Sequence, residues 1–266
     1  MRESAARRIK AILLRHLYVL RTSWPRILEL AYWPTVQMVL WGFITTFFLS
    51  HSSWVAQAAG VLISAVLLWD VLFRANLGVS LTFMEEMWSR NLGQLFVSPL
   101  RPHELVASLL LMSSIRTVIS VTPAALLALP LYDVWVFSLG PPLIAFFGNI
   151  LVLGWAVGLV VSALVLRFGL GAESLAWVAI FAFAPLSGIY YPIATLPAWL
   201  QPLAWCLPSA YVFEGMRAVL FDGTFRLDLF AGAVGLNLVY LGGATALFLY
   251  MFRVAREKGL LLQQGE

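Results

Sequence analysis

The sequence predicts an all-α polytopic membrane protein with six transmembrane helices. Of its 266 residues, 61% are hydrophobic and only 11% are charged, whereas about a quarter of the residues of a soluble domain are charged. The apolar residues are gathered into blocks of about 20, the length that a helix needs to cross ~30 Å of hydrocarbon. A soluble fold of this length would need more polar surface than the sequence supplies.

Residues 1–26 predict an interfacial helix. Apolar side chains recur on one helical face at positions Ile9, Ile12, Leu13, Leu17 and Leu20. Basic side chains lie mostly on the other faces, where they meet anionic lipid headgroups while the apolar stripe rests in the membrane surface. This helix either anchors the topology or contacts a partner.

Six spans follow, near residues 30–49, 55–77, 105–129, 143–165, 174–191 and 229–252. An even number of spans places both termini on one side of the membrane. With the termini in the cytoplasm, the inside segments carry thirteen basic residues and the outside loops carry two, Arg217 and Arg226. The positive-inside rule therefore predicts cytoplasmic termini.

Residues 84–102, between the second and third spans, form a polar and amphipathic segment. Its apolar residues recur at spacings of three and four, which places them on one helical face. Pro99 and Pro102 lack the backbone donors that a longer helix needs. We expect a short cytoplasmic helix parallel to the membrane.

Residues 187–223 form a second unusual segment, which connects the fifth and sixth spans on the outside. It is apolar and aromatic, and four prolines interrupt it: Pro192, Pro197, Pro202 and Pro208. Broken helices of this kind are stable neither in water nor when exposed to lipid. We expect two short helices that re-enter the outer leaflet. Glu214 and Arg217, three residues apart, either hold an outer gate closed or keep the second helix at the water boundary.

Three charged residues are expected within spans. Asp70 and Arg74 lie one helical turn apart in the second span, where they can pair, and Arg116 lies near the middle of the third. Charges at that depth are costly, so each is either a functional residue or a shielded structural one. Gly154 and Gly158 form a GxxxG pattern in the fourth span, which predicts close packing within the subunit.

Several function classes are excluded by missing motifs. The chain has no GxxxxGK[ST] phosphate loop, so any ATP hydrolysis must occur on another chain. It also lacks the paired carboxylates, the clustered metal ligands and the GxSxG pattern of enzymes. We expect no catalytic residue, no metal and no cofactor on this chain. The basic residues follow membrane topology, which argues against nucleic-acid binding.

Two stretches carry a resemblance to a known family. They read RNLGQLFVSPL, from Arg90, and SGIYYPIATLPAWLQPLAWCLPSAYVFEGMR, from Ser187. Together with the order of the expected helices, they resemble the membrane subunits of ABC-2 type exporters. The resemblance covers nearly the whole chain, which is therefore expected to be a single domain, residues 1–266.

The resemblance implies a partner and a set of contacts. Two membrane subunits, identical or related, assemble with two cytoplasmic ATPase subunits that hold ATP and Mg²⁺. The segment 84–102 becomes the coupling helix, with candidate ATPase contacts Glu85, Glu86, Trp88, Arg90, Asn91, Leu95 and Phe96. Secondary contacts are Arg7, Arg8 and Arg15. The candidate external gate is Pro192, Pro197, Trp199, Pro208, Glu214 and Arg217.

The resemblance also implies a location and a direction of transport. The family's usual setting is the bacterial inner membrane, surrounded by lipid, and its members export lipids, hydrophobic drugs or lipid-linked polysaccharides. Few polar residues occur in the expected spans, which favours a hydrophobic or amphipathic substrate; a lipid-linked polysaccharide is the alternative. A passive channel and a membrane scaffold without an ATPase are the alternatives from other classes.

Overall fold

The computed structural model describes residues 4–51, 55–89, 91, 98, 100–133 and 135–258. Every regular element in these ranges is helical. The long helices are α1 (Ala5–Thr22), α2 (Trp24–His51), α3 (Val55–Trp88), α5 (Pro102–Tyr132), α6 (Pro141–Phe168) and α10 (Leu227–Glu257). The shorter ones are α7 (Leu175–Phe183), α8 (Gln201–Trp205) and α9 (Pro208–Asp222), with 3₁₀ turns η1 (Val136–Leu139), η2 (Leu170–Ser174), η3 (Ala184–Leu186) and η4 (Ile193–Thr195).

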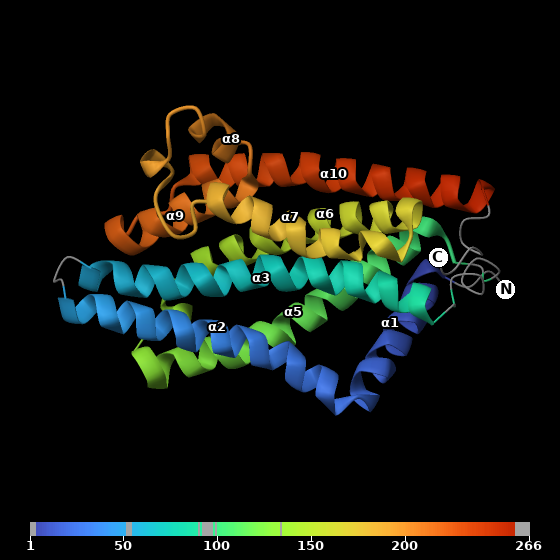
Figure 1. Ribbon diagram of the computed structural model, residues 1–266, viewed down its shortest axis with the longest axis horizontal. Helices are drawn as coiled ribbons and strands as arrows, with labels where there is room; N and C mark the ends of the chain where they lie inside the picture. Colours follow the sequence, from blue (N-terminus) through green and yellow to red (C-terminus); the bar gives the residue numbers. More distant parts are fainter. Residues whose placement is uncertain are drawn as a thin grey trace.

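The long helices run side by side, with α3 at the centre of the bundle (Figure 1). Within its most apolar window, α3 is 89% buried inside the chain, whereas the corresponding windows of α2 and α10 are 17% and 22% buried. α1 lies at an angle across one end, where α10 also finishes, and α8 and α9 lie at the other end. We call these the α1 end and the α9 end.

Small side chains let α6 approach α3. A Cβ atom added at Gly158 would lie 2.7 Å from the Cβ of Val79 and 2.8 Å from the carbonyl oxygen of Asn76. At Gly154 it would lie 2.5 Å from the Cβ of Ala75. Lipid tails are as apolar as the helix surfaces, so no hydrophobic force brings helices together within a membrane. Close van der Waals packing of this kind drives their association instead. The GxxxG pattern therefore serves packing within the subunit, as predicted.

Buried amides reinforce the bundle. The Asn76 amide of α3 donates to the carbonyl of Ala176 in α7 at 2.9 Å. The Asn237 amide of α10 donates to Asn149 Oδ1 in α6, also at 2.9 Å. These bonds join helices that are far apart in sequence, and each gives a buried amide N–H donor a partner that it would otherwise lack in hydrocarbon.

The number of spans is confirmed only in part. Five helices in the described residues are long and apolar enough to cross a membrane: α2, α3, α5, α6 and α10. The expected fifth span, residues 174–191, corresponds to a shorter apolar stretch, Gly171–Leu186. Gly169, with φ of +77°, ends α6 just before this stretch, and Pro185 falls in the 3₁₀ turn that follows α7. Six complete spans and the re-entrant path of residues 187–223 stay predictions.

The expected helix over residues 84–102 does not begin where the periodicity suggested. Met84–Trp88 are the last residues of α3, which is helical without interruption from Val55. Nothing between Gly78 and Trp88 breaks the helix, because this stretch contains no proline. Residues 90, 92–97 and 99 lie outside the described residues, and with them Arg90, Leu95 and Phe96. A helix parallel to the membrane in that stretch stays a prediction.

Candidate functional site

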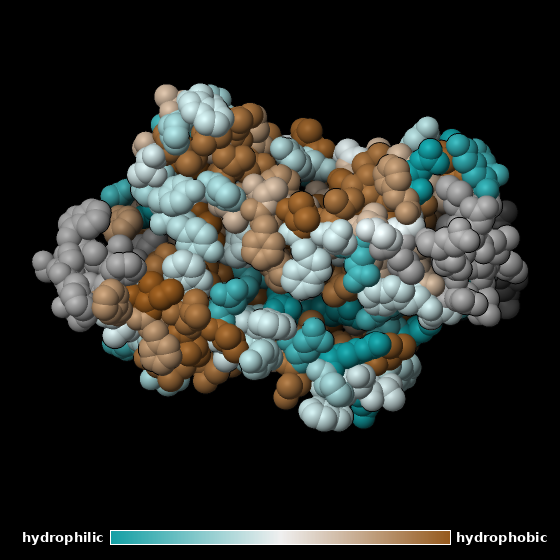
Figure 2. Space-filling view, viewed as in Figure 1, coloured by the Kyte–Doolittle hydropathy of each residue, from teal (hydrophilic) through white to brown (hydrophobic). Residues whose placement is uncertain are grey.

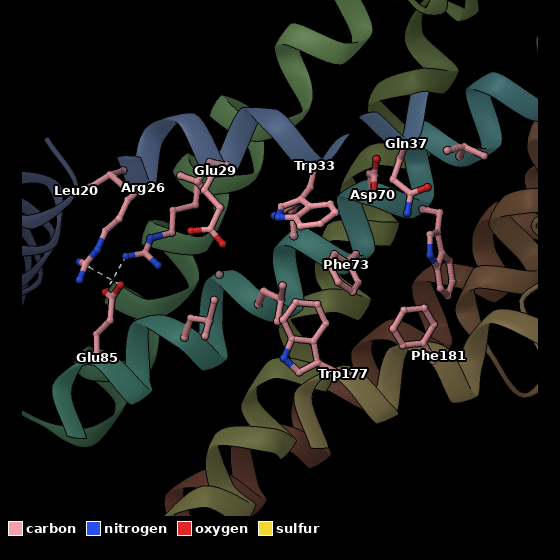
Figure 3. Close-up of a pocket in the computed structure, with 18 of the residues that line it drawn as sticks. Leu20, Arg26, Glu29, Trp33, Gln37, Asp70, Phe73, Glu85, Trp177 and Phe181 are labelled. Carbon is pink, nitrogen blue, oxygen red and sulfur yellow. Dashed lines mark hydrogen bonds and ion pairs between the residues drawn. The ribbon is translucent and has the colours of Figure 1, made fainter. Parts of the chain in front are cut away.

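A cleft of about 600 Å³ lies between α2, α3 and α7. Figure 3 shows side chains of these three helices converging on it. Aromatic rings make up much of its wall: Trp33, Trp41, Trp69, Phe73, Trp88, Trp177, Phe181 and Tyr190. A hydrophilic band crosses this face of the molecule between hydrophobic regions (Figure 2). The cleft is thus an aromatic cavity with polar groups inside a bundle of membrane-spanning length.

Helical spacing explains how the wall forms. Trp33, Gln37 and Trp41 follow one another at intervals of four and so share one face of α2. Across the cleft, Phe73 of α3 contacts Trp177 of α7 edge to face, with ring centroids 5.3 Å apart. At the α9 end, Trp41 stacks on Tyr190 at 4.8 Å. Contacts between rings of α2, α3, α7 and the segment that follows η3 therefore define the cavity.

An ionic cluster borders the cleft at the α1 end. Glu85 of α3 accepts a hydrogen bond from Arg116 Nη2 of α5 at 2.8 Å, and its other oxygen lies 3.6 Å from Arg26 of α2. Arg116 is only 6% exposed, so water does not solvate its positive charge fully, and the carboxylate of Glu85 compensates that charge. Figure 3 shows the Arg26 guanidinium directed at this carboxylate. Glu85 thereby joins α2, α3 and α5 at one point.

Glu86, the next residue, binds α1. Its carboxylate lies 2.9 Å from Arg15 and 3.2 Å from His16 Nε2, the latter without hydrogen-bond geometry, and it accepts a bond from the Asn91 amide at 2.8 Å. Burial lowers the pKa of His16, which the attraction of Glu86 only partly opposes. The imidazole is therefore neutral at pH 7, and Arg15 carries the positive charge of this contact.

A third glutamate ties α1 to α5. Glu104 accepts a hydrogen bond from Arg8 Nε at 2.9 Å and a second one from Nη2 of the same guanidinium. It also accepts one from the backbone N–H of Arg101 at 3.0 Å, which caps the first turn of α5. Paired bonds of this kind fix both position and orientation.

Asp70 and Arg74, which were predicted to pair, do not form an ion pair with each other in the described part of the chain. Asp70 is 5% exposed, and its Oδ2 atom has no hydrogen-bond partner there. The Arg74 guanidinium instead lies 5.6 Å over the ring of Phe73 and interacts electrostatically with Asp70 and Glu29. Asp70 and Arg74 both line the cleft.

Comparison with protein families gives one match. The family model for the ABC-2 type transporter matches residues 9–221, most of the chain. The chain belongs to the ABC-2 type transporter family. It is accordingly a membrane component of ABC transporters and a transport protein. No curated protein matches the sequence.

In this ABC-2 permease, three of the four predicted contact residues that the structure describes between residues 85 and 96 are engaged within the subunit. Glu85, Glu86 and Asn91 hold partners in α1, α2, α3 or α5. Arg15 is the α1 partner of Glu86, and Arg8 pairs with Glu104. Arg7 is exposed. Trp88 is 47% exposed, at the α1 end of the cleft.

The predicted external-gate residues gather at the α9 end of the permease. Glu214 Oε1 accepts bonds from Arg217 Nη2 at 3.1 Å and from the backbone N–H of Ile193 at 2.7 Å. Residue 193 follows Pro192 directly, so this contact attaches the connecting loop to α9. Pro208 begins α9, Pro197 precedes α8, and Trp199 is exposed. Among the described residues, no group of His, Cys, Asp or Glu is placed to hold a metal ion.

Sequence reasoning missed the aromatic cleft, the role of Glu104 and the contact of His16. The four-residue spacing of Trp33, Gln37 and Trp41 was a usable signal for one wall, but the other walls come from α3 and α7. No sequence pattern indicated the contact of Glu104, because its partner Arg8 lies 96 residues away.

Proposed function

We propose that this permease is the membrane subunit of an ATP-driven exporter in a bacterial inner membrane, and that it moves an amphipathic or hydrophobic substrate out of the cytoplasm. A separate ATPase subunit, present in two copies, binds ATP and Mg²⁺. The α1 end faces the cytoplasm, where the basic residues of α1 meet anionic lipid. Two permease copies, identical or related, form the path.

The observation that carries the proposal is the set of three glutamates around residues 84–102. Glu85 and Glu86 come at the start of this segment, and Glu104 comes just after it. Each is held by a basic residue of α1 or α2. A displacement of the segment by the ATPase therefore pulls directly on α1 and α2.

The same contacts reach the cleft. Arg26, Glu85 and Arg116 are part of its lining, so a shift of the segment 84–102 changes the shape and charge of the α1 end of the cavity. ATP binding moves the permease between two states only if the ATPase contacts differ in those states. We assign Glu85, Glu86 and Glu104 to transmission within the subunit, and Trp88, Arg90, Leu95 and Phe96 to direct contact with the ATPase.

The proposed dimer is supported by the exposed apolar side of α2. Phe43 is 67% exposed and Leu28 58%, and α2 flanks the opening of the cleft. Lipid or a second copy must cover this surface. A second copy placed against α2 and α7 would enclose the cleft between two subunits.

Purification of the tagged permease from its native membranes tests the proposal. We expect a chain with a phosphate-loop sequence to co-purify at one copy per permease, and the complex to hydrolyse ATP. Cysteines introduced at Trp88 should crosslink to that chain. A permease that purifies as a homogeneous particle without any ATPase would support the passive channel or the scaffold instead.

Replacement of Trp88 by alanine should uncouple the complex. We expect substrate-stimulated ATP hydrolysis and transport to fall at least about fivefold, the effect of losing an interfacial aromatic anchor worth about 1 kcal/mol or more. Trp135→Ala is the matched control, because Trp135 has a similar exposure of 43% but lies beyond the far end of α5. Full coupling in the Trp88 variant contradicts this assignment.

Replacement of Arg217 by alanine tests the outer gate. Without the guanidinium, Glu214 no longer has its helical partner, and the loop at Ile193 is held by one bond. We expect leakage of substrate from proteoliposomes without ATP, while insertion is normal. Arg217→Lys should leak less, because it keeps the charge. Unchanged export and no leak in the alanine variant would contradict the gate. Glu214 and Arg217 would then only keep α9 at the boundary between membrane and water.

A further inference from the structure

Asp70 differs from the other two carboxylates of the cleft. Glu85 is bound by two guanidinium groups, and Glu29 is exposed. Asp70 is buried, and its Oδ2 atom has no hydrogen-bond partner in the described residues. A carboxylate in such a place is costly unless a ligand compensates it.

The depth of Asp70 excludes the ordinary headgroup region. With a rise of 1.5 Å per residue, Asp70 lies about 22 Å from the Val55 end of α3 and about 27 Å from the Trp88 end. Headgroups of bilayer lipids do not reside at the middle of a membrane-spanning helix. A molecule that meets Asp70 must therefore enter the cleft itself.

The surroundings of Asp70 are aromatic. Asp70 lines the cleft together with Gln37 and Trp33 of α2 (Figure 3). Phe73, one turn further along α3, contacts Trp177 and Phe181 with ring centroids 5.3 Å and 6.3 Å apart. A carboxylate in an aromatic cavity attracts an organic cation, because the carboxylate is negatively charged and the faces of the rings carry a negative electrostatic potential.

We propose that the cleft binds an amphiphile that carries an ammonium or similar organic cation, with Asp70 as its counter-ion. This inference rests on the proposed function, since it names the substrate class of the same permease. A neutral sugar would fit the aromatic rings, but it would leave the charge of Asp70 uncompensated. Arg74 does not replace the ligand, because it lies over Phe73 and divides its attraction between Asp70 and Glu29.

Binding of tetraphenylphosphonium to the purified full-length permease tests the proposal. The chain is placed in phosphatidylglycerol nanodiscs, whose lipids carry no ammonium group, and equilibrium binding of the labelled cation is measured without any ATPase. We expect Asp70→Asn to weaken binding at least about tenfold, as for the loss of one charged partner. Asp70→Glu, which keeps the charge, should retain most of the affinity.

A second variant keeps the test valid if Asp70→Asn does not fold. Trp177→Ala removes a ring from the α7 wall and should weaken binding about threefold, the size of one cation–π contact. Trp135→Ala, outside the cleft, should have no effect. Tetraphenylborate, an anion of the same shape, should not displace the cation at the Asp70 site.

Two results would overturn the proposal. The first is equal affinity in wild type and both cleft variants. The second is displacement by tetraphenylborate or by octyl glucoside, which would indicate an anion or a glycosyl group. Displacement by phosphatidylethanolamine would support the proposal and identify the ammonium-bearing amphiphile as a membrane lipid. Because no ATPase is present, failure here leaves the proposed exporter function standing, and co-purification tests that function separately.

Discussion

The double variant Gly154→Ala/Gly158→Ala is expected to lose about 2 kcal/mol or more of the free energy of unfolding. Each new methyl group would press on backbone carbonyl oxygens of α3, 2.8 Å from Leu72 O and 2.8 Å from Asn76 O. Backbone atoms of a buried helix cannot move aside as a flexible side chain can, and overpacking costs about 1–3 kcal/mol at each such site. The two sites share one interface, so their effects need not add.

Thermal unfolding in detergent, followed by size-exclusion chromatography, measures this loss. Gly148→Ala is the matched control in the same helix, since a Cβ atom there would meet nothing within 4 Å. We expect Gly148→Ala to unfold like wild type. If all three alanines behaved alike, the close contact of α6 and α3 would not contribute to stability.

The second large effect is expected for Glu85→Ala. This change leaves the guanidinium of Arg116, whose side chain is 7% exposed, without its carboxylate. Removal of one partner from a buried ion pair costs about 3 kcal/mol or more, because the remaining charge is not solvated. We expect reduced expression and a lower midpoint of thermal unfolding.

Replacing both partners should restore much of the loss. The variant Glu85→Leu/Arg116→Met removes the stranded charge, so its stability should lie closer to wild type than that of Glu85→Ala. Asp228→Ala is the control: Asp228 pairs with Arg226 at an exposed position, where ion pairs contribute little, and we expect no measurable change. A double variant less stable than Glu85→Ala would argue against the stranded charge as the cause.

The helices and their membrane character were predictable because local patterns determine them. Apolar blocks of spanning length predicted α2, α3, α5, α6 and α10, and the amphipathic spacing of residues 5–21 predicted α1. The sixth predicted span, 229–252, corresponds to α10, which begins two residues earlier and ends five residues later. The fifth span stays a prediction: it corresponds to the shorter apolar stretch Gly171–Leu186, and apolar composition does not report where Gly169 and Pro185 interrupt a helix.

The site was harder to predict, because its parts come from distant segments. The spacing of Glu85 and Glu86 placed them on a polar face but did not tell whether water, an ATPase or α1 covers that face. The structure shows that α1 and its neighbours do so. Asp70 and Arg74 had the spacing of an ion pair, yet a nearby ring and a second carboxylate draw Arg74 elsewhere. Competition among neighbours of this kind is not encoded in spacing.

The bond between Arg8 and Glu104 has a consequence for biosynthesis. The two residues are 96 positions apart, so the bond from Arg8 to Glu104 forms only after the start of α5 has left the ribosome. During that interval α2 and α3 are already inserted, and α1 contacts lipid, α2 and α3. Completion of the α1 contacts is thus a late event in the maturation of the nascent chain, and it follows the synthesis of the segment that we expect the ATPase to bind.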